Sequence, residues 1–320
     1  MLIQVLLFLA GLIVLAVAAE FLVRGATQIA LVLGLPPLLV GLTIVAYGTS
    51  LPEFVVSVLA ATKGSSTLAL GNALGSNLLN TGLILGLAAI IFPLAADRVL
   101  FRRDLPIHLG FVLLFAAVIY NGFIGRYEGL VMIALMLVYI VGSAVFEWRA
   151  RNANNAAAAL EEIEEEVGER PKSIWVAVFF VLLGSAGLYF GADLMVNAAI
   201  TIAQEFGISE RVIGLTVVAF GTSLPELATT LAAARKKHAD MIIGNLLGSN
   251  IFNLMLIVGT AGALAPFAIN LRQVLVEYGF LALNAVMIYL FMWTGRKLTR
   301  IEGVVLSACY LAFVGYLLVR

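Results

Sequence analysis

The sequence predicts an all-α membrane protein of ten transmembrane helices, arranged as two inverted five-helix repeats. Three observations support this fold class. Of the 320 residues, 62% are hydrophobic and only 12% are charged, and the mean hydropathy of +1.07 is far above that of a soluble domain. The apolar residues fall into about ten stretches of membrane-spanning length. One pair of motifs also occurs twice at a constant spacing.

Short polar breaks separate the ten predicted spans. A hydrocarbon core of roughly 30 Å needs about 20 apolar residues per helix, which each stretch supplies. The first stretch starts without the basic residues of a signal peptide, so we expect a retained helix. The spans are expected near residues 2–22, 36–62, 67–94, 104–122, 127–147, 173–198, 209–234, 239–267, 273–293 and 300–319.

The distribution of cations predicts the orientation of the chain. If the N-terminus lies outside, the breaks that face the cytoplasm hold fourteen Lys and Arg residues, against five on the other side. Cytoplasmic loops carry an excess of Lys and Arg, so this bias favours a cell-membrane protein with both termini outside. The net charge is zero and no basic patch interleaved with aromatic residues is present, so no nucleic-acid partner is expected.

The two halves of the chain are copies of one unit. GLTIVAYGTSLPE at 41–53 recurs as GLTVVAFGTSLPE at 214–226, with eleven of thirteen positions identical and an offset of 173. GNALGSNLLN at 71–80 recurs at the same offset as GNLLGSNIFN at 244–253. Because five helices per half is an odd number, the second copy must enter the membrane from the opposite side. The predicted parts are a first half at 1–150, an acidic cytoplasmic linker at 151–172 and an inverted second half at 173–320.

Two glutamates carry the chemistry of the predicted site. Glu53 and Glu226 end the two GTSLPE motifs near the middle of spans two and seven, where an acid costs about 2.5–3.5 kcal/mol on insertion scales. No Lys or Arg is expected at that depth, so a bound cation is the simplest source of compensating charge. The preceding prolines are expected to kink the helices and free the carbonyl oxygens of Gly48 and Gly221. Carboxylate and carbonyl oxygens are the ligands that Ca2+ and Na+ prefer.

Spans three and eight offer further oxygen ligands. Small-xxx-small glycine spacing would let these helices approach the glutamates closely. Hydrogen bonding between helices, with no ligand role, is the alternative for any one polar residue. In each span two asparagines and a serine recur every four residues and share one helical face: Asn72, Ser76 and Asn80 in the first repeat, and Asn245, Ser249 and Asn253 in the second.

Other polar residues are weaker candidates. Glu20 and Asp193 match across the repeat near the ends of spans one and six, where a solvated or helix-capping role is favoured over a vestibule that gathers cations. His108 and His238 lie near predicted cytoplasmic ends and are not related by the offset. We therefore expect both histidines to be solvated or interfacial rather than shared ligands.

At these motifs the chain resembles the cation/calcium exchanger superfamily, specifically the prokaryotic type of the Na+/Ca2+ exchanger branch. Two copies of GTSLPE and two of GNxxGSN carry the resemblance, which covers most of the chain. It implies that Ca2+ binds the two glutamates and the carbonyls of Thr49 and Thr222, not those of the glycines. Na+ would share these groups and add the alanine carbonyls and the serines. The predicted metal site comprises Glu53, Glu226, Thr49, Thr222, Ser50, Ser223, Ala46, Ala219, Ser76, Ser249, Asn80 and Asn253.

Two positions bear on which ions are exchanged. Asn253 stands where several members of the superfamily have an aspartate, so only two acids line the predicted centre and K+ dependence stays open. The H+/Ca2+ branch typically carries a glutamate in its GNxxE motif, where this chain has Gly75 and Gly248. H+/Ca2+ exchange is therefore a less favoured alternative.

The residues and the resemblance together predict a secondary active antiporter that exchanges Ca2+ for Na+ by alternating access. Two facing carboxylates repel when the site is empty, so moving it is costly until Ca2+, several Na+ or protons neutralise it. A cation channel is a rival of another class, because it would conduct without a counter-ion. An intramembrane enzyme would leave the carbonyls and amides without a task. The expected partners are Ca2+, Na+ and the lipid bilayer, with no cofactor and no obligate protein partner.

Overall fold

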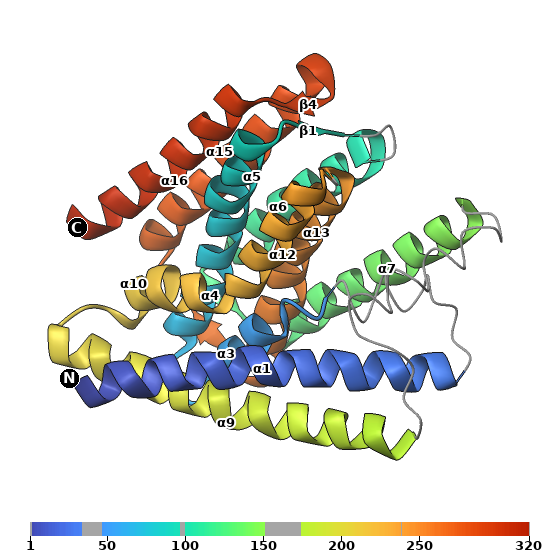
Figure 1. Cartoon of the computed structure of the whole chain (residues 1–320). Helices are drawn as coiled ribbons and strands as arrows, with labels where there is room; N and C mark the ends of the chain where they lie inside the picture. The colour runs from blue at the N-terminus through green and yellow to red at the C-terminus, as the bar shows by residue number, and fades with distance from the viewer. Residues whose placement is uncertain (1, 34–46, 97–99, 151–173, 238, 320) are drawn as a thin grey trace.

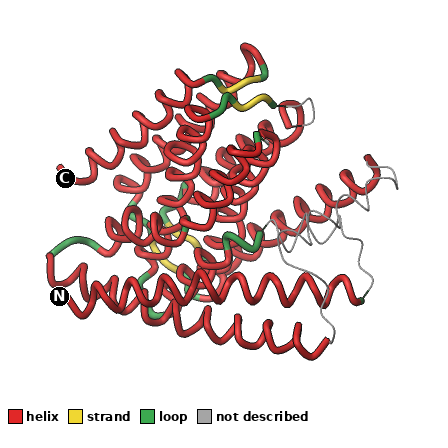
Figure 2. The backbone as a smooth tube through the Cα atoms, viewed as in Figure 1, coloured by secondary structure: helices red, strands yellow, loops and turns green. Residues whose placement is uncertain are grey.

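The computed structural model describes residues 2–33, 47–96, 100–150, 174–237 and 239–319, which are helical almost throughout (Figures 1 and 2). The predicted linker at 151–172 lies outside the described residues. Four two-residue strands are also present, in two antiparallel pairs: β1 (Leu94–Ala95) with β4 (Lys297–Leu298), and β2 (Phe123–Ile124) with β3 (Phe267–Ala268). The sequence did not predict these strands, because two residues are too few to show an alternating pattern.

In each half the described residues form a long first helix, a helix that starts after the GTSLPE serine, a helix with a π-helical turn, and two outer helices. The first half contains α1 (Leu2–Val32), α3 (Leu51–Thr62), α4 (Ser66–Leu78), the π-helical turn η2 (Leu79–Ile84), α5 (Leu85–Ile91), η3 (Leu100–Asp104), α6 (Leu105–Ile119) and α7 (Arg126–Ala150). The second contains α9 (Ile174–Phe206), α10 (Glu210–Ile213), η5 (Gly214–Val218), α11 (Ala219–Thr222), α12 (Leu224–Lys236), α13 (Ala239–Phe252), η6 (Asn253–Ile257), α14 (Val258–Leu264), α15 (Leu271–Gly295) and α16 (Arg300–Val319).

A described helix overlaps each of the ten predicted spans, but the number of crossings remains a prediction. Among the described residues, seven helices are long and apolar enough to cross a membrane, and the helices on either side of Ser223, bent by 43°, give an eighth candidate. The twelve-residue α3 is short on its own. The part of its predicted span that precedes residue 47 lies outside the described residues.

Helices α1 and α9 run beyond their predicted ends. The spans were expected to stop at residues 22 and 198, but the helices reach Val32 and Phe206. Polar residues such as Glu20 and Asp193 do not end a helix, because they do not interrupt its backbone hydrogen bonds. Gly207, with a φ of 64°, ends α9 in the left-handed conformation that only glycine adopts readily.

Helices α1 and α9 lie side by side along one edge of the molecule (Figure 1). Gly11 lies against Gly191, and Gly184 lies against Ala18, so the two helices are antiparallel. A Cβ on Gly11 would lie 2.8 Å from the Gly191 carbonyl oxygen, and one on Gly184 would lie 2.7 Å from that of Ala18. The two contacts are equivalent, because the offset of 173 relates Gly11 to Gly184 and Ala18 to Gly191. Antiparallel repeat-related helices are what inversion requires, although inversion of the complete halves remains a prediction.

The core forms where α4, η2 and α5 meet α13, η6 and α14, whose residues are mostly buried. Glycines again let helices touch: Gly86 of α5 contacts Gly303 of α16, and Gly259 of α14 contacts Gly129 of α7. Gly86 and Gly259 are related by the offset of 173. The two halves therefore pack onto their outer helices in the same way, and they leave α4 and α13 at the centre of the fold.

Candidate functional site

The GTSLPE motif of the second repeat interrupts its helix at Ser223, and in both repeats a helix starts directly after the serine. Ser50 has φ −88° and ψ 6°, and Ser223 has φ −87° and ψ 10°, so both stand just outside helical geometry. Pro52 and Pro225 are the second residues of α3 and α12, where a proline is tolerated because the N–H it lacks would have no partner. The kink was expected at the prolines. Instead, a new helix starts one residue before each proline, at Leu51 and at Leu224.

This restart places both acids in the first turn of a helix. Glu53 is the third residue of α3, and Glu226 is the third residue of α12. The N-terminus of a helix carries about half a positive charge, which favours a carboxylate there. The same turn faces the interior of the fold, where Glu53 is 1% exposed and Glu226 is fully buried. The backbone thus supplies part of the charge compensation that the acids need.

Each carboxylate is held by a serine from the opposite repeat. Ser223 Oγ donates a hydrogen bond of 2.8 Å to Glu53 Oε1, and Ser50 Oγ donates one of 2.9 Å to Glu226 Oε1. The pattern S-x-x-E commonly forms a capping box within one helix start, but neither serine makes a capping bond here. The two helix starts are therefore joined to each other, and both acids belong to one cluster.

The second oxygen of each carboxylate has no hydrogen-bond partner in the part of the chain that the structure describes. Glu53 Oε2 and Glu226 Oε2 are buried, and neither accepts a hydrogen bond from any described residue. Neither acid forms an ion pair within the described ranges. In that part of the chain no three His, Cys, Asp or Glu side chains gather to hold a metal, so the site offers two acids surrounded by neutral oxygens. Such a site suits hard cations with oxygen ligands.

The hydroxyls and amides of α4 and α13 surround this cluster. Ser249 Oγ lies 3.1 Å from Ser50 Oγ, while its repeat equivalent, Ser76 Oγ, is buried with no partner among the described residues. Asn72 Nδ2 donates to Ser57 Oγ at 2.9 Å, and Asn72 Oδ1 accepts from Thr222 Oγ1 at 3.1 Å. Asn72 therefore bonds to Thr222, a predicted site residue. Hydrogen bonding between helices was the alternative to a ligand role for Asn72.

Four buried asparagines cross-link the two repeats beside the serines. Asn253 Nδ2 donates to Asn77 Oδ1 at 3.0 Å, and Asn80 Nδ2 donates to Asn250 Oδ1 at 3.3 Å. Asn80 and Asn253 were predicted site residues, whereas Asn77 and Asn250 were missed. The signal that could have found them is the duplicated GSN motif, in which both residues recur at the offset of 173.

The remaining predicted ligands are less completely placed. Thr49 Oγ1 is buried without a partner in the described structure. The Ala219 carbonyl already accepts hydrogen bonds from the Ser223 backbone N–H at 3.0 Å and from Thr222 Oγ1 at 3.4 Å. Ala46 lies outside the described residues. The ligand roles of these residues stay predictions.

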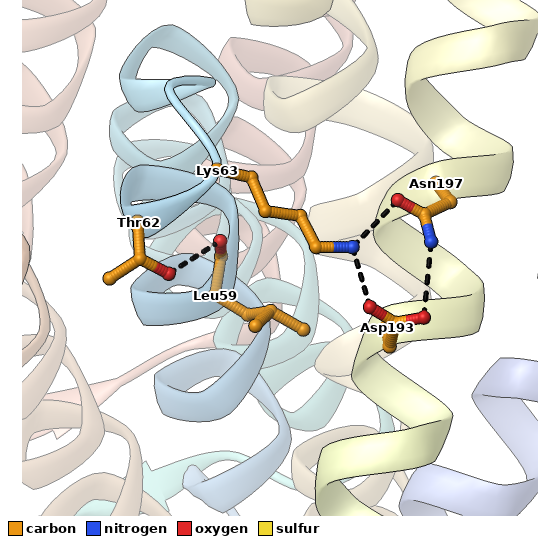
Figure 3. A network of polar contacts seen from close by, with 5 residues as sticks. All are labelled: Leu59, Thr62, Lys63, Asp193 and Asn197. Atoms are coloured by element: carbon orange, nitrogen blue, oxygen red, sulfur yellow. Dashed lines mark hydrogen bonds and ion pairs between the residues drawn. The ribbon is translucent and has the colours of Figure 1, made fainter.

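Of the weaker candidates, His108 differs from expectation, whereas Asp193 is partly exposed but also paired. His108 of α6 is only 1% exposed rather than solvated, and its Nε2 has no partner among the described residues. Asp193 does not simply face water: Lys63 Nζ lies 2.6 Å from both Asp193 Oδ1 and Asn197 Oδ1, which joins the end of α3 to α9 (Figure 3). In the same view, Thr62 Oγ1 bonds only to its own helix. His238 lies outside the described residues.

A further ion pair was not predicted from the sequence. Glu277 of α15 is 2% exposed and pairs with Arg211 of α10. Neither residue belongs to a duplicated motif, so nothing in the sequence associated them. The pair brings its own cation, whereas Glu53 and Glu226 have none among the described residues.

Comparison with known proteins decides the family. A family model described as sodium/calcium exchanger protein matches residues 3–145 and 176–319, and so includes both repeats and all the predicted site residues. The chain belongs to the sodium/calcium exchanger family. Members of this family are membrane transporters, so the chain is a multi-pass membrane protein of the exchanger type.

Relatives within this exchanger family span the whole chain. The chain is 35% identical to the putative antiporter CaxA of Alkalimonas amylolytica, across 99% of this chain and 98% of that protein. It is 30% identical to the sodium/calcium exchanger MaX1 of Methanosarcina acetivorans, across 97% of each. A solved structure of the sodium-calcium exchanger NCX_Mj, soaked with 10 mM Na+ and zero Ca2+, matches 98% of both chains with a TM-score of 0.66 and 32% identity.

Proposed function

We propose that this exchanger moves Ca2+ against Na+ at the cluster that holds Glu53 and Glu226. The observation that carries the proposal is the reciprocal bonding of Ser223 to Glu53 and of Ser50 to Glu226, which brings two buried acids from opposite repeats together. The unpartnered Oε2 atoms are then the first ligands of the ion. MaX1 and NCX_Mj, which are named as sodium/calcium exchangers, support the same choice of ions.

Charge balance explains why exchange would be obligatory. Two ionised carboxylates are neutralised by one Ca2+ or by two Na+, and an empty pair of buried acids is strongly disfavoured. The cluster would therefore change its exposure only when it is loaded. A channel would conduct cations without a counter-ion. A requirement for Na+ on the opposite side of the membrane therefore distinguishes an exchanger from a channel. Proton exchange and K+ dependence stay alternatives, because protons or K+ could neutralise the same two acids.

The proposed ligand set keeps all the residues expected from the sequence. The structure supports Ser76, Asn80 and Asn253 with buried oxygens that have no partner among the described residues. The complete proposed set is Glu53, Glu226, Thr49, Thr222, Ser50, Ser223, Ala46, Ala219, Ser76, Ser249, Asn80 and Asn253.

Alternating access would move α1 and α9 across this cluster as one antiparallel pair. Gly11 and Gly184 bring the two backbones into contact, which supports motion as a unit. We place both termini outside the cell membrane and the acidic linker at 151–172 in the cytoplasm, because that orientation accounts for the excess of cations on one side.

The test is Ca2+ uptake into proteoliposomes driven by an outward Na+ gradient. Glu53→Gln and Glu226→Gln each remove one charge with little change of shape, and we expect either variant to abolish uptake. Glu302→Gln, a change to an acid of the first turn of α16 outside the cluster, is the control and should retain it. Uptake by the unmodified protein should also weaken from pH 8 to pH 6, because protons compete for the carboxylates. Full uptake in both site variants would refute the proposal.

A further inference from the structure

We propose that Asn77 is a positioning residue of the ion site, which orients the Asn253 amide so that its oxygen rather than its NH2 group is available to a cation. The inference rests on the proposed exchange at Glu53 and Glu226. Asn77 lies near the end of α4 and Asn253 begins η6, and both side chains are buried. Asn77 itself lies outside the proposed ligand set.

A backbone carbonyl fixes the orientation of Asn77. Asn77 Nδ2 donates a hydrogen bond of 3.1 Å to the carbonyl oxygen of Asn250. A carbonyl oxygen can only accept, so the Asn77 side chain must face it with its NH2 group. The Asn77 Oδ1 atom then points elsewhere and accepts from Asn253 Nδ2 at 3.0 Å. Reversing either amide would place two donors or two acceptors against each other.

These two hydrogen bonds leave the Asn253 Oδ1 atom free to bind a cation. Asn253 has donated its NH2 group to Asn77, and its Oδ1 is buried with no partner among the described residues. Asn253 follows Ser249 by four residues along the same helix, and Ser249 lies 3.1 Å from Ser50, which binds Glu226. Positions four apart share a helical face, so the Asn253 side chain leaves its helix on the same face as Ser249, which contacts the glutamate cluster through Ser50.

The repeat-related pair has no such anchor. Asn80 Nδ2 donates to Asn250 Oδ1 at 3.3 Å, but Asn250 Nδ2 has no partner in the described structure. The Asn77 carbonyl, which is equivalent to the anchoring one, accepts instead from Thr81 Oγ1 at 2.7 Å. The position equivalent to Thr81 is Leu254, which has no hydroxyl. Asn80 and Asn250 can reverse their amides together and keep their bond, so the two halves of the site are not equivalent.

The test compares Asn77→Ala with Asn250→Ala in proteoliposomes, by 45Ca2+ uptake against Na+. The control is matched because both changes remove a buried asparagine side chain at equivalent positions, and Asn250→Ala keeps the backbone carbonyl that anchors Asn77. We expect Asn77→Ala to raise the KM for Ca2+ roughly tenfold, the effect of losing one oriented hydrogen bond, with little change in the maximal rate. Asn250→Ala should raise it less than about threefold.

A double-mutant cycle separates positioning from packing. If Asn77 acts through Asn253, then Asn77→Ala should change KM no further in an Asn253→Ala background. The proposal is overturned if Asn77→Ala raises KM by the same factor in the wild-type and Asn253→Ala backgrounds. It is also overturned if Asn77→Ala and Asn250→Ala have equal KM values. Asn77→Ser, whose short hydroxyl cannot span both partners, repeats the comparison should the alanine variant fail to fold. Uptake by the wild-type protein is measured first. If the wild-type protein takes up no Ca2+, the proposed exchange itself is contradicted, which is a different outcome from a failed prediction for Asn77.

Discussion

At the scale of single residues, the hydroxyls of Ser50 and Ser223 determine how two buried acids are accommodated. Each hydroxyl satisfies one oxygen of a carboxylate that belongs to the other repeat. A hydrogen bond to a charged group contributes about 1.5–3 kcal/mol, which is comparable with the cost of placing an acid at the centre of a membrane helix. The serines are therefore as much a part of the acid pair as the glutamates.

Removing one serine donor should make the site more sensitive to protons. In Ser223→Ala, Glu53 loses its bond from Ser223, so its ionised form is disfavoured. We expect the KM for Ca2+ to rise roughly tenfold at pH 8 and by a larger factor at pH 6. Ser307→Ala, which removes a buried hydroxyl of α16 outside the cluster, is the control. An unchanged KM for Ser223→Ala at both pH values would contradict this role.

Sequence motifs could find the acids but not their partners. Glu53 and Glu226 stand out because duplicated carboxylates in apolar spans need compensation. Their serines share the same motifs, yet the sequence favours a bond within one helix start over the observed bond between repeats. Asn77 carries no charge and lies off the predicted polar face. Its role depends on a carbonyl 173 residues away, which no local pattern reveals.

At the scale of elements, one ion pair connects the site-bearing helix α3 to the α1 and α9 pair. Lys63 follows α3 directly, and it bonds Asp193 and Asn197 of α9 (Figure 3). The equivalents of Lys63 and Asp193 are Lys236 and Glu20, which carry the same charges in the other half. If α9 moves past α3 during exchange, the Lys63 bonds must break and reform.

Loss of the Lys63 pair should therefore alter the rate of exchange more than the affinity for ions. Exposed pairs contribute about 0.2–1 kcal/mol, which corresponds to at most roughly fivefold in rate. We expect Lys63→Asp to change the maximal rate of 45Ca2+ uptake by that order with little change in KM. The charge swap Lys63→Asp with Asp193→Lys should restore the rate. A rate that the single change leaves unaltered would show that the pair does not take part in exchange.

The sequence predicted where helices occur better than where they end or break. Apolar stretches long enough to span a bilayer located a helix in each expected range. Helices α1 and α9 run past their expected ends, because polar residues within them, such as Glu20 and Asp193, leave the helical hydrogen bonds intact. The π-helical turns η2 and η6 and the strand pairs depend on contacts between halves, which single-helix periodicity does not encode.

At the scale of the whole molecule, duplication provides the acid pair with its partners. One repeat supplies a buried carboxylate and a serine, and the other repeat supplies the serine and carboxylate that complete them. The offset of 173 also relates the glycine contacts of α1 and α9, and it relates Gly86 of α5 to Gly259 of α14. One departure from symmetry, Thr81 against Leu254, can be read from the sequence, but its effect on the Asn77 carbonyl is seen only in the contacts.

The central claim is that one cation is bound jointly by acids from both halves. The most direct measurement is a crystal structure of the protein soaked with Sr2+, a divalent cation that can be located by its anomalous scattering. We expect one strong peak within about 2.3–2.8 Å of carboxylate oxygens of both Glu53 and Glu226, close to the Ca2+ range. A peak that contacts only one of the two glutamates, or no peak between them, would contradict it.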